Sequence, residues 1–177
     1  MKTIFSILWA TFLALSLTAS ASIYAPDVEA HKVFLTVAKE ISGTTSFTLF
    51  VAASRFSHPD ELFEGNENKA KEIDGYVFYE DPIELSHLDI IRIQDLFSKP
   101  EYFEPYTTGK FCGGFYPDYA IFWKRGGRGF VAYVCFGCGE IKAKTDKGST
   151  MVDMTKEGRS EFVEVLSKFG KLHKNQK

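Results

Sequence analysis

Two apolar segments, DYAIFWK (118–124) and GFVAYVCF (129–136), flank the sequence RGGR (125–128). This arrangement is typical of a β-hairpin whose turn is supplied by glycines. If residues 125–128 form a four-residue loop, Lys124 pairs with Gly129, and the numbers of paired residues sum to 253. In this pairing, the residues that point to one face of the hairpin are apolar, and so are the residues that point to the other face. The sequence therefore predicts two central strands of a sheet that is covered on both sides.

Three segments have the periodicity of amphipathic helices. The first, 27–43, has Asp27 as a capping residue and Gly43 at its end, although a strand over 32–37 competes with it. The second begins after Ser86, which forms a variant capping box with Asp89, and stops at Lys99-Pro100. The third covers 156–169, and Gly170 is expected to cap it, followed by a frayed tail.

Further strands are expected at 46–56, 76–80 and 140–145, with loops at 57–75 and 100–115. The resulting order is α-β-β-α-β-β-β-α. This order predicts the α+β class, with a single antiparallel sheet built around a central hairpin at about 118–136 and helices packed on it.

The first 21 residues have the pattern of a secretory signal peptide. Lys2 is followed by an apolar run from Ile4 to Leu17, and Ala19-Ser20-Ala21 supplies a small-residue cleavage site. The run is about 14 residues long, whereas a membrane-spanning helix needs roughly 20. We therefore expect an exported protein, periplasmic or secreted. Residues 22–177 would form one domain with no membrane span after cleavage.

The net charge of the chain limits which kinds of binding partner are expected. The whole chain has a formal net charge of −2, and loss of Lys2 with the signal peptide makes it −3. A nearly neutral chain lacks the positive patch that nucleic-acid binding requires, so no nucleic-acid partner is expected.

The candidate chemical site is the set of three cysteines, Cys112, Cys135 and Cys138. The hairpin register places Cys135 opposite Asp118 and Cys138 opposite Phe115. Cys112 is then about 10 Å from Cys138 along a regular ladder, beyond the reach of a disulfide. A bulge at the neighbouring glycines would close this gap. Because three is an odd number, at most one bridge forms within the chain.

Several interpretations of these cysteines remain open. One structural disulfide, or none, is the simplest. A zinc site would take Cys112 as third ligand and one of five further side chains as fourth: His31, His58, His87, His173 or Glu140. Thiol-redox chemistry would use the C-x-x-C pair, but the segment after it is strand-like and lacks the helix N-terminus that lowers a thiol pKa. A nucleophilic Cys112 with a histidine partner is the fourth alternative.

The segments CGGFYPDYAIFW (112–123) and VCFGCGEIK (134–142) resemble a group of uncharacterised bacterial exported proteins. Members of that group share a Cys, a nearby Pro, a hairpin and a CFxC motif, followed by a short C-terminal helix. The resemblance covers roughly residues 110–170. It implies an α+β fold and a three-cysteine cluster, and it implies no activity.

The chain has no Ser-His-Asp set, zincin motif or paired-carboxylate motif typical of a hydrolase. The sequence therefore favours a non-enzymatic domain with a structural or binding role and structural cysteines. The alternative is a metal-binding or thiol-redox protein that uses Cys112, Cys135 and Cys138.

Overall fold

The computed structural model describes residues 27–53, 70–107 and 114–175. Its elements, in chain order, are α2 (Val28–Ile41), β1 (Phe47–Val51), β2 (Ala70–Ile73), β3 (Tyr76–Tyr79), α3 (His87–Ser98), η2 (Pro100–Tyr102), β4 (Phe103–Pro105), β5 (Tyr119–Arg125), β6 (Arg128–Cys135), β7 (Glu140–Thr145), β8 (Gly148–Met154) and α4 (Lys156–Asn175). The predicted signal peptide, 1–21, lies outside the described residues.

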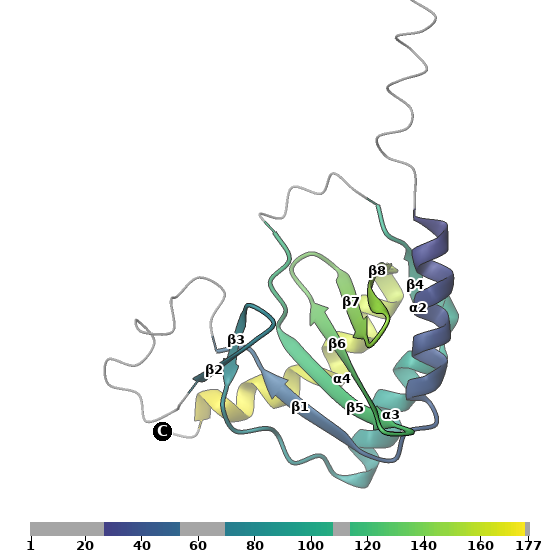
Figure 1. Ribbon diagram of the computed structural model, residues 1–177. Coiled ribbons are helices and arrows are strands. Elements are labelled where there is room, and N and C mark those ends of the chain that lie inside the picture. Colours follow the sequence, from purple (N-terminus) through teal and green to yellow (C-terminus); the bar gives the residue numbers. More distant parts are fainter. Residues whose placement is uncertain (1–26, 54–69, 108–113, 176–177) are drawn as a thin grey trace, which may run out of the picture.

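The main sheet has six antiparallel strands in the order β1-β5-β6-β7-β8-β4, and β2 and β3 form a separate two-stranded sheet (Figure 1). The predicted α+β class is therefore confirmed. The small β2–β3 sheet goes beyond that prediction. No helix among the described residues is long and apolar enough to cross a membrane.

The central hairpin has the predicted register, with Lys124 opposite Gly129 and Tyr119 opposite Val134. Pairing continues one step further than expected, because Arg125 also pairs with Arg128. The turn is thus Gly126-Gly127 alone, and both residues have positive φ, +56° and +78°. Two-residue turns of this kind match the twist of the strands they join, which explains why glycine is needed at both positions.

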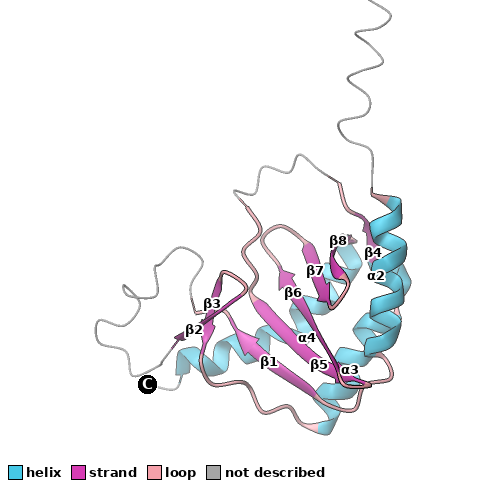
Figure 2. Ribbon diagram, viewed as in Figure 1, coloured by secondary structure: helices cyan, strands magenta, loops and turns pink. Residues whose placement is uncertain are grey.

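Both faces of the sheet are covered, as predicted, but by different layers (Figure 2). One face packs against α2, α3 and α4 through a core that includes Phe34, Phe97 and Phe162. The other face is partly covered by the β2–β3 hairpin, whose Phe78 joins Phe50 and Tyr133 in a smaller cluster. We call these the helix face and the hairpin face.

The first two predicted helices are confirmed. Asp27 caps α2 by accepting a hydrogen bond from the backbone N–H of Ala30 at 2.8 Å. The competing strand over 32–37 is wrong, because the apolar side chains follow the helical period and bury one stripe. At α3 the predicted capping box is complete, with Ser86 and Asp89 each accepting from the other's backbone N–H.

The end of the last helix differs from the prediction. Gly170 does not cap α4, which continues to Asn175. A Cβ added at Gly170 would lie 2.7 Å from the Tyr119 hydroxyl oxygen, so this glycine permits close packing of the helix on β5. The Tyr119 hydroxyl also forms a hydrogen bond with the backbone of Gly170, and burial raises the pKa of Tyr119 to about 12.

Three strands lie where none was expected: β2 and β4 fall inside the predicted loops, and β8 was not anticipated. The strand β4 is only three residues long and pairs with the distant β8. No local sequence pattern signals such a pairing, because its stabilisation comes from tertiary packing.

Candidate functional site

The C-x-x-C motif forms the connection between β6 and β7. Cys135 ends β6 and pairs with Glu140, the first residue of β7. The turn between them closes with a hydrogen bond from the Gly139 N–H to the Cys135 carbonyl at 3.0 Å, and Gly139 has a φ of +70°. The motif is therefore the turn of a second hairpin, and its last glycine supplies the left-handed backbone.

The thiols of this turn have distinct surroundings. Cys135 is buried, and its Sγ accepts a hydrogen bond from the Cys138 N–H at 3.4 Å. The Cys138 thiol donates to the Gly114 carbonyl at 3.2 Å, which agrees with its predicted place near Phe115. Asp118, predicted to lie opposite Cys135, accepts from the Phe136 N–H at 2.6 Å.

The structure brings Cys135 and Cys138 together without a bridge between them. Cys112 lies outside the described residues, so its pairing stays a prediction. Within the described ranges, no three His, Cys, Asp or Glu side chains form a group suited to a metal ion.

The remaining candidate zinc ligands are dispersed or not described. His31 contacts the Phe103 carbonyl through Nε2 at 3.1 Å, and His87 begins α3. Glu140 is buried beside Cys135. His58 lies outside the described residues, as does the side chain of His173.

A different group of side chains lies on the hairpin face. Asp74, in the β2–β3 turn, accepts a hydrogen bond from the Tyr133 hydroxyl at 2.6 Å and from Lys144 Nζ at 2.5 Å. These three residues, which we call the Asp74 latch, attach the tip of the β2–β3 hairpin to β6 and β7. Asp74 is also the one non-glycine residue with positive φ, +53°, among the described residues. Aspartate tolerates this conformation better than most residues.

The latch perturbs the titration of its members. The hydrogen bonds from Lys144 and then Tyr133 lower the pKa of Asp74. Burial, reinforced by the hydrogen bond to Asp74, raises the pKa of Tyr133. At neutral pH the latch therefore holds a charged carboxylate between an ammonium group and a neutral phenol.

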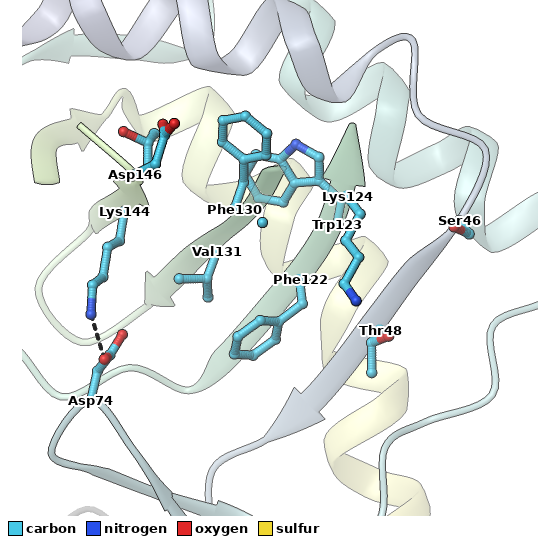
Figure 3. A pocket seen from close by; sticks show the side chains of 12 residues that line it. Ser46, Thr48, Asp74, Phe122, Trp123, Lys124, Phe130, Val131, Lys144 and Asp146 are labelled. Carbon is cyan, nitrogen blue, oxygen red and sulfur yellow. Dashed lines mark hydrogen bonds and ion pairs between the residues drawn. The ribbon is translucent and has the colours of Figure 1, made fainter. Parts of the chain in front are cut away.

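Beside the latch lies a groove of about 590 Å³, shown in Figure 3. Its apolar floor includes Phe122 and Val131, and the latch residues Asp74 and Lys144 form one wall. Polar side chains around the rest of the groove are those of Ser46, Thr48, Lys124, Thr145 and Asp146. The volume lies within the range of about 300–1,000 Å³ that is usual for small-molecule sites. A smaller cavity of about 330 Å³ lies on the other side of the latch, against Tyr133 and Lys142.

One backbone position leaves space in this groove. Gly129 lines it, and a Cβ added there would meet nothing within 4 Å. Because Gly129 has no positive φ, its lack of a side chain is not explained by backbone conformation. Its effect is to leave the part of the groove next to the Gly126-Gly127 turn without a side chain.

The groove was not predicted from sequence. Its residues come from five segments that only the fold brings together: the approach to β1, the β2–β3 turn, β5, β6 and the end of β7. One signal was present in EIKAKT, where Ile141 and Ala143 alternate with Lys142 and Lys144. Such alternation indicates a strand with one buried face and one charged face.

Comparisons of this chain with protein-family models, curated proteins and solved structures gave no match.

Proposed function

We propose that this protein is a non-enzymatic binding domain, acting outside the cytoplasm, that holds a small ligand in the groove beside the Asp74 latch. The observation that carries the proposal is the open, apolar-floored groove above Gly129, with charged and hydroxyl-bearing side chains around it. A few polar groups around an apolar floor are typical of small-molecule sites.

The state of the acid at the groove wall favours binding over catalysis. A general acid or base needs a pKa near the working pH. The pKa of Asp74 is lowered instead, and both its carboxylate oxygens accept hydrogen bonds from latch partners. This carboxylate therefore serves to hold the groove wall in place.

Filling the space above Gly129 tests the proposal. The probe is 1-anilinonaphthalene-8-sulfonate, an aromatic anion that fluoresces on apolar surfaces, titrated into the native protein. We expect saturable binding to the parent and a loss of at least tenfold in affinity for Gly129→Leu. The variant should fold, because the new side chain meets open space.

The matched control is Thr36→Leu, which adds the same side chain to an exposed position of α2 in the helix layer. It should bind the probe like the parent. Equal binding by Gly129→Leu and the parent would contradict the proposal.

Export is supported by the signal-peptide pattern of residues 1–21. Intact mass after denaturation and alkylation without reductant tests it together with the cysteine predictions. Cleavage after Ala21 gives a chain that begins at Ser22. One alkyl group indicates a disulfide among the three cysteines, whereas three alkyl groups contradict the structural-disulfide interpretation and require a native mass spectrum for zinc.

A further inference from the structure

The lysines of the hairpin face differ in whether their charge is already engaged. Lys71 lies 3.5 Å above the Phe50 ring, Lys142 lies 5.8 Å from the Tyr76 ring, and Lys144 is ion-paired to Asp74. Within the part of the chain that the structure describes, Lys124 has no ion-pair or ring partner. Its ammonium group borders the groove (Figure 3).

The two acidic residues of the groove also differ in whether their charge is already paired. Asp74 is committed to the latch, whereas Asp146 borders the groove and forms no ion pair among the described residues. The groove thus offers one ammonium and one carboxylate that do not neutralise each other. Figure 3 shows the side chains of Lys124 and Asp146 apart from each other, one on each side of Phe130 in this view.

The sheet register explains why these two charges stay apart. Lys124 pairs with Gly129 on β6, whereas Asp146 lies in the turn after β7, two residues beyond Lys144, the last residue of β7 that pairs with β6. The two charged residues therefore lie on either side of β6, the strand that carries Gly129. Since β6 lies between β5 and β7, two strand spacings of about 10 Å in total separate the strand of Lys124 from the strand that Asp146 follows. The open space at Gly129 is on this middle strand of the three.

The polarity of the surroundings supports the same assignment. The hydroxyl-bearing side chains of Ser46 and Thr48 border the groove from β1 and the residue before it, and β1 pairs with the strand that carries Lys124. Hydroxyl groups donate to anions as the lysine does. Beside these charges, two residues further along β5 and β6, the floor is apolar, formed by the paired residues Phe122 and Val131.

We infer that the groove binds an elongated zwitterion, with its carboxylate at Lys124, its ammonium at Asp146 and an apolar chain across Gly129 and Val131. This inference rests on the proposed function, because it specifies the ligand of the same groove. The chemical class is that of an ω-amino acid, whose charges are further apart than those of an α-amino acid.

The test compares four six-carbon probes by chemical-shift titration of the native protein at low ionic strength, followed at the amides of Lys124 and Gly129. The probes are 6-aminohexanoate, hexanoate, hexylamine and hexanamide. Each exposed charge pair contributes modestly, so 6-aminohexanoate should bind roughly two- to fivefold tighter than either singly charged probe. Hexanamide should bind most weakly.

Charge exchange gives the sharper readout. Lys124→Glu and Asp146→Lys should each abolish the preference for 6-aminohexanoate. The double variant Lys124→Glu/Asp146→Lys should restore it, because the zwitterion can bind in the reverse orientation. A purely structural effect of either substitution would not be repaired by the second.

The outcomes separate this inference from the proposed function. If all four probes bind equally and the exchanges change nothing, while the anilinonaphthalene probe is still blocked by Gly129→Leu, the zwitterion assignment is overturned and the groove remains the binding site. If Gly129→Leu affects no probe, the proposed function fails, and this inference fails with it.

Discussion

The two faces of the central sheet are formed by the same strands, but they differ in how fully they are covered. On the helix face, side chains such as Ile121 and Ala132 are fully buried beneath three helices. On the hairpin face, a small aromatic cluster occupies one part and the groove occupies another. Since strand residues alternate between faces, neighbouring positions of β5 and β6 face the helix-covered core and the groove in turn. The difference shows that a sheet can be stabilised from one side and leave the other available for a ligand.

The largest expected effect tests which face provides the stability. Phe162 of α4 is fully buried, with its ring 5.2 Å from that of Phe97 and 6.1 Å from that of Phe103. We expect Phe162→Ala to lower the free energy of unfolding by about 3–5 kcal/mol, measured by urea denaturation. The same truncation at the half-buried Phe122 of the groove should cost about 1–2 kcal/mol, because less apolar area is lost. Equal losses would remove the distinction between the faces.

A second substitution tests how closely the helix layer packs. In a helix interior, alanine is more favourable than glycine by about 1 kcal/mol. Gly170→Ala would therefore stabilise the helix if no other part of the protein packed against this position. Here the added Cβ would overlap the Tyr119 hydroxyl, and we expect a net loss of about 1–2 kcal/mol.

The check on that prediction is the double variant Tyr119→Phe/Gly170→Ala, which removes the overlapping oxygen. Its free energy of unfolding should exceed that of Tyr119→Phe alone. A stabilising effect of Gly170→Ala in the parent background would show that the helix does not approach β5 this closely.

The smallest expected effect concerns the attachment of the β2–β3 hairpin. Asp74→Asn keeps a side chain that tolerates positive φ while removing the carboxylate of the latch. We expect a loss of about 1 kcal/mol at neutral pH, since the ion pair is partly exposed. Because the folded-state pKa of Asp74 is lowered, its contribution is present above the ordinary value of 3.8 and is lost as the pH falls through the folded value.

Urea denaturation between pH 2 and 7 measures this dependence. The parent and Asp74→Asn should differ at pH 7 and converge at the acid end. A difference that stayed constant with pH would assign the effect to hydrogen-bond geometry instead of charge.

Much of the fold could be predicted because its signals are local. The Gly126-Gly127 turn sets the register of the central hairpin, and the Ser86–Asp89 box sets the start of α3. The prediction that Gly170 caps the last helix was wrong, because a glycine at a helix end and a glycine at a close contact look the same in the sequence. Only the position of Tyr119 distinguishes the two cases.

The groove could not be predicted for a different reason. Asp74 and Lys144 are 70 residues apart in sequence, and no sequence pattern in either segment indicates that the two side chains meet. Lys124 and Asp146 are brought to the same groove by the β5–β6 and β6–β7 pairings, of which only the first was available from the sequence. The cysteines could be proposed as a site from the sequence because they are close together in it, whereas the candidate ligand-binding side chains are dispersed along the chain.

The strand order also bears on how the chain assembles. Strands β5 to β8 are neighbours both in sequence and in the sheet, joined by short turns, so each pairing closes a small loop. The outer strands β1 and β4 come from far earlier in the chain, and their pairing with β5 and β8 closes much longer loops. Loop-closure entropy rises with loop length, so the four-strand meander is the part of the sheet that forms at the lowest entropic cost. The groove, which needs β1 and the β2–β3 turn as well, is then complete only when the most distant segments have joined.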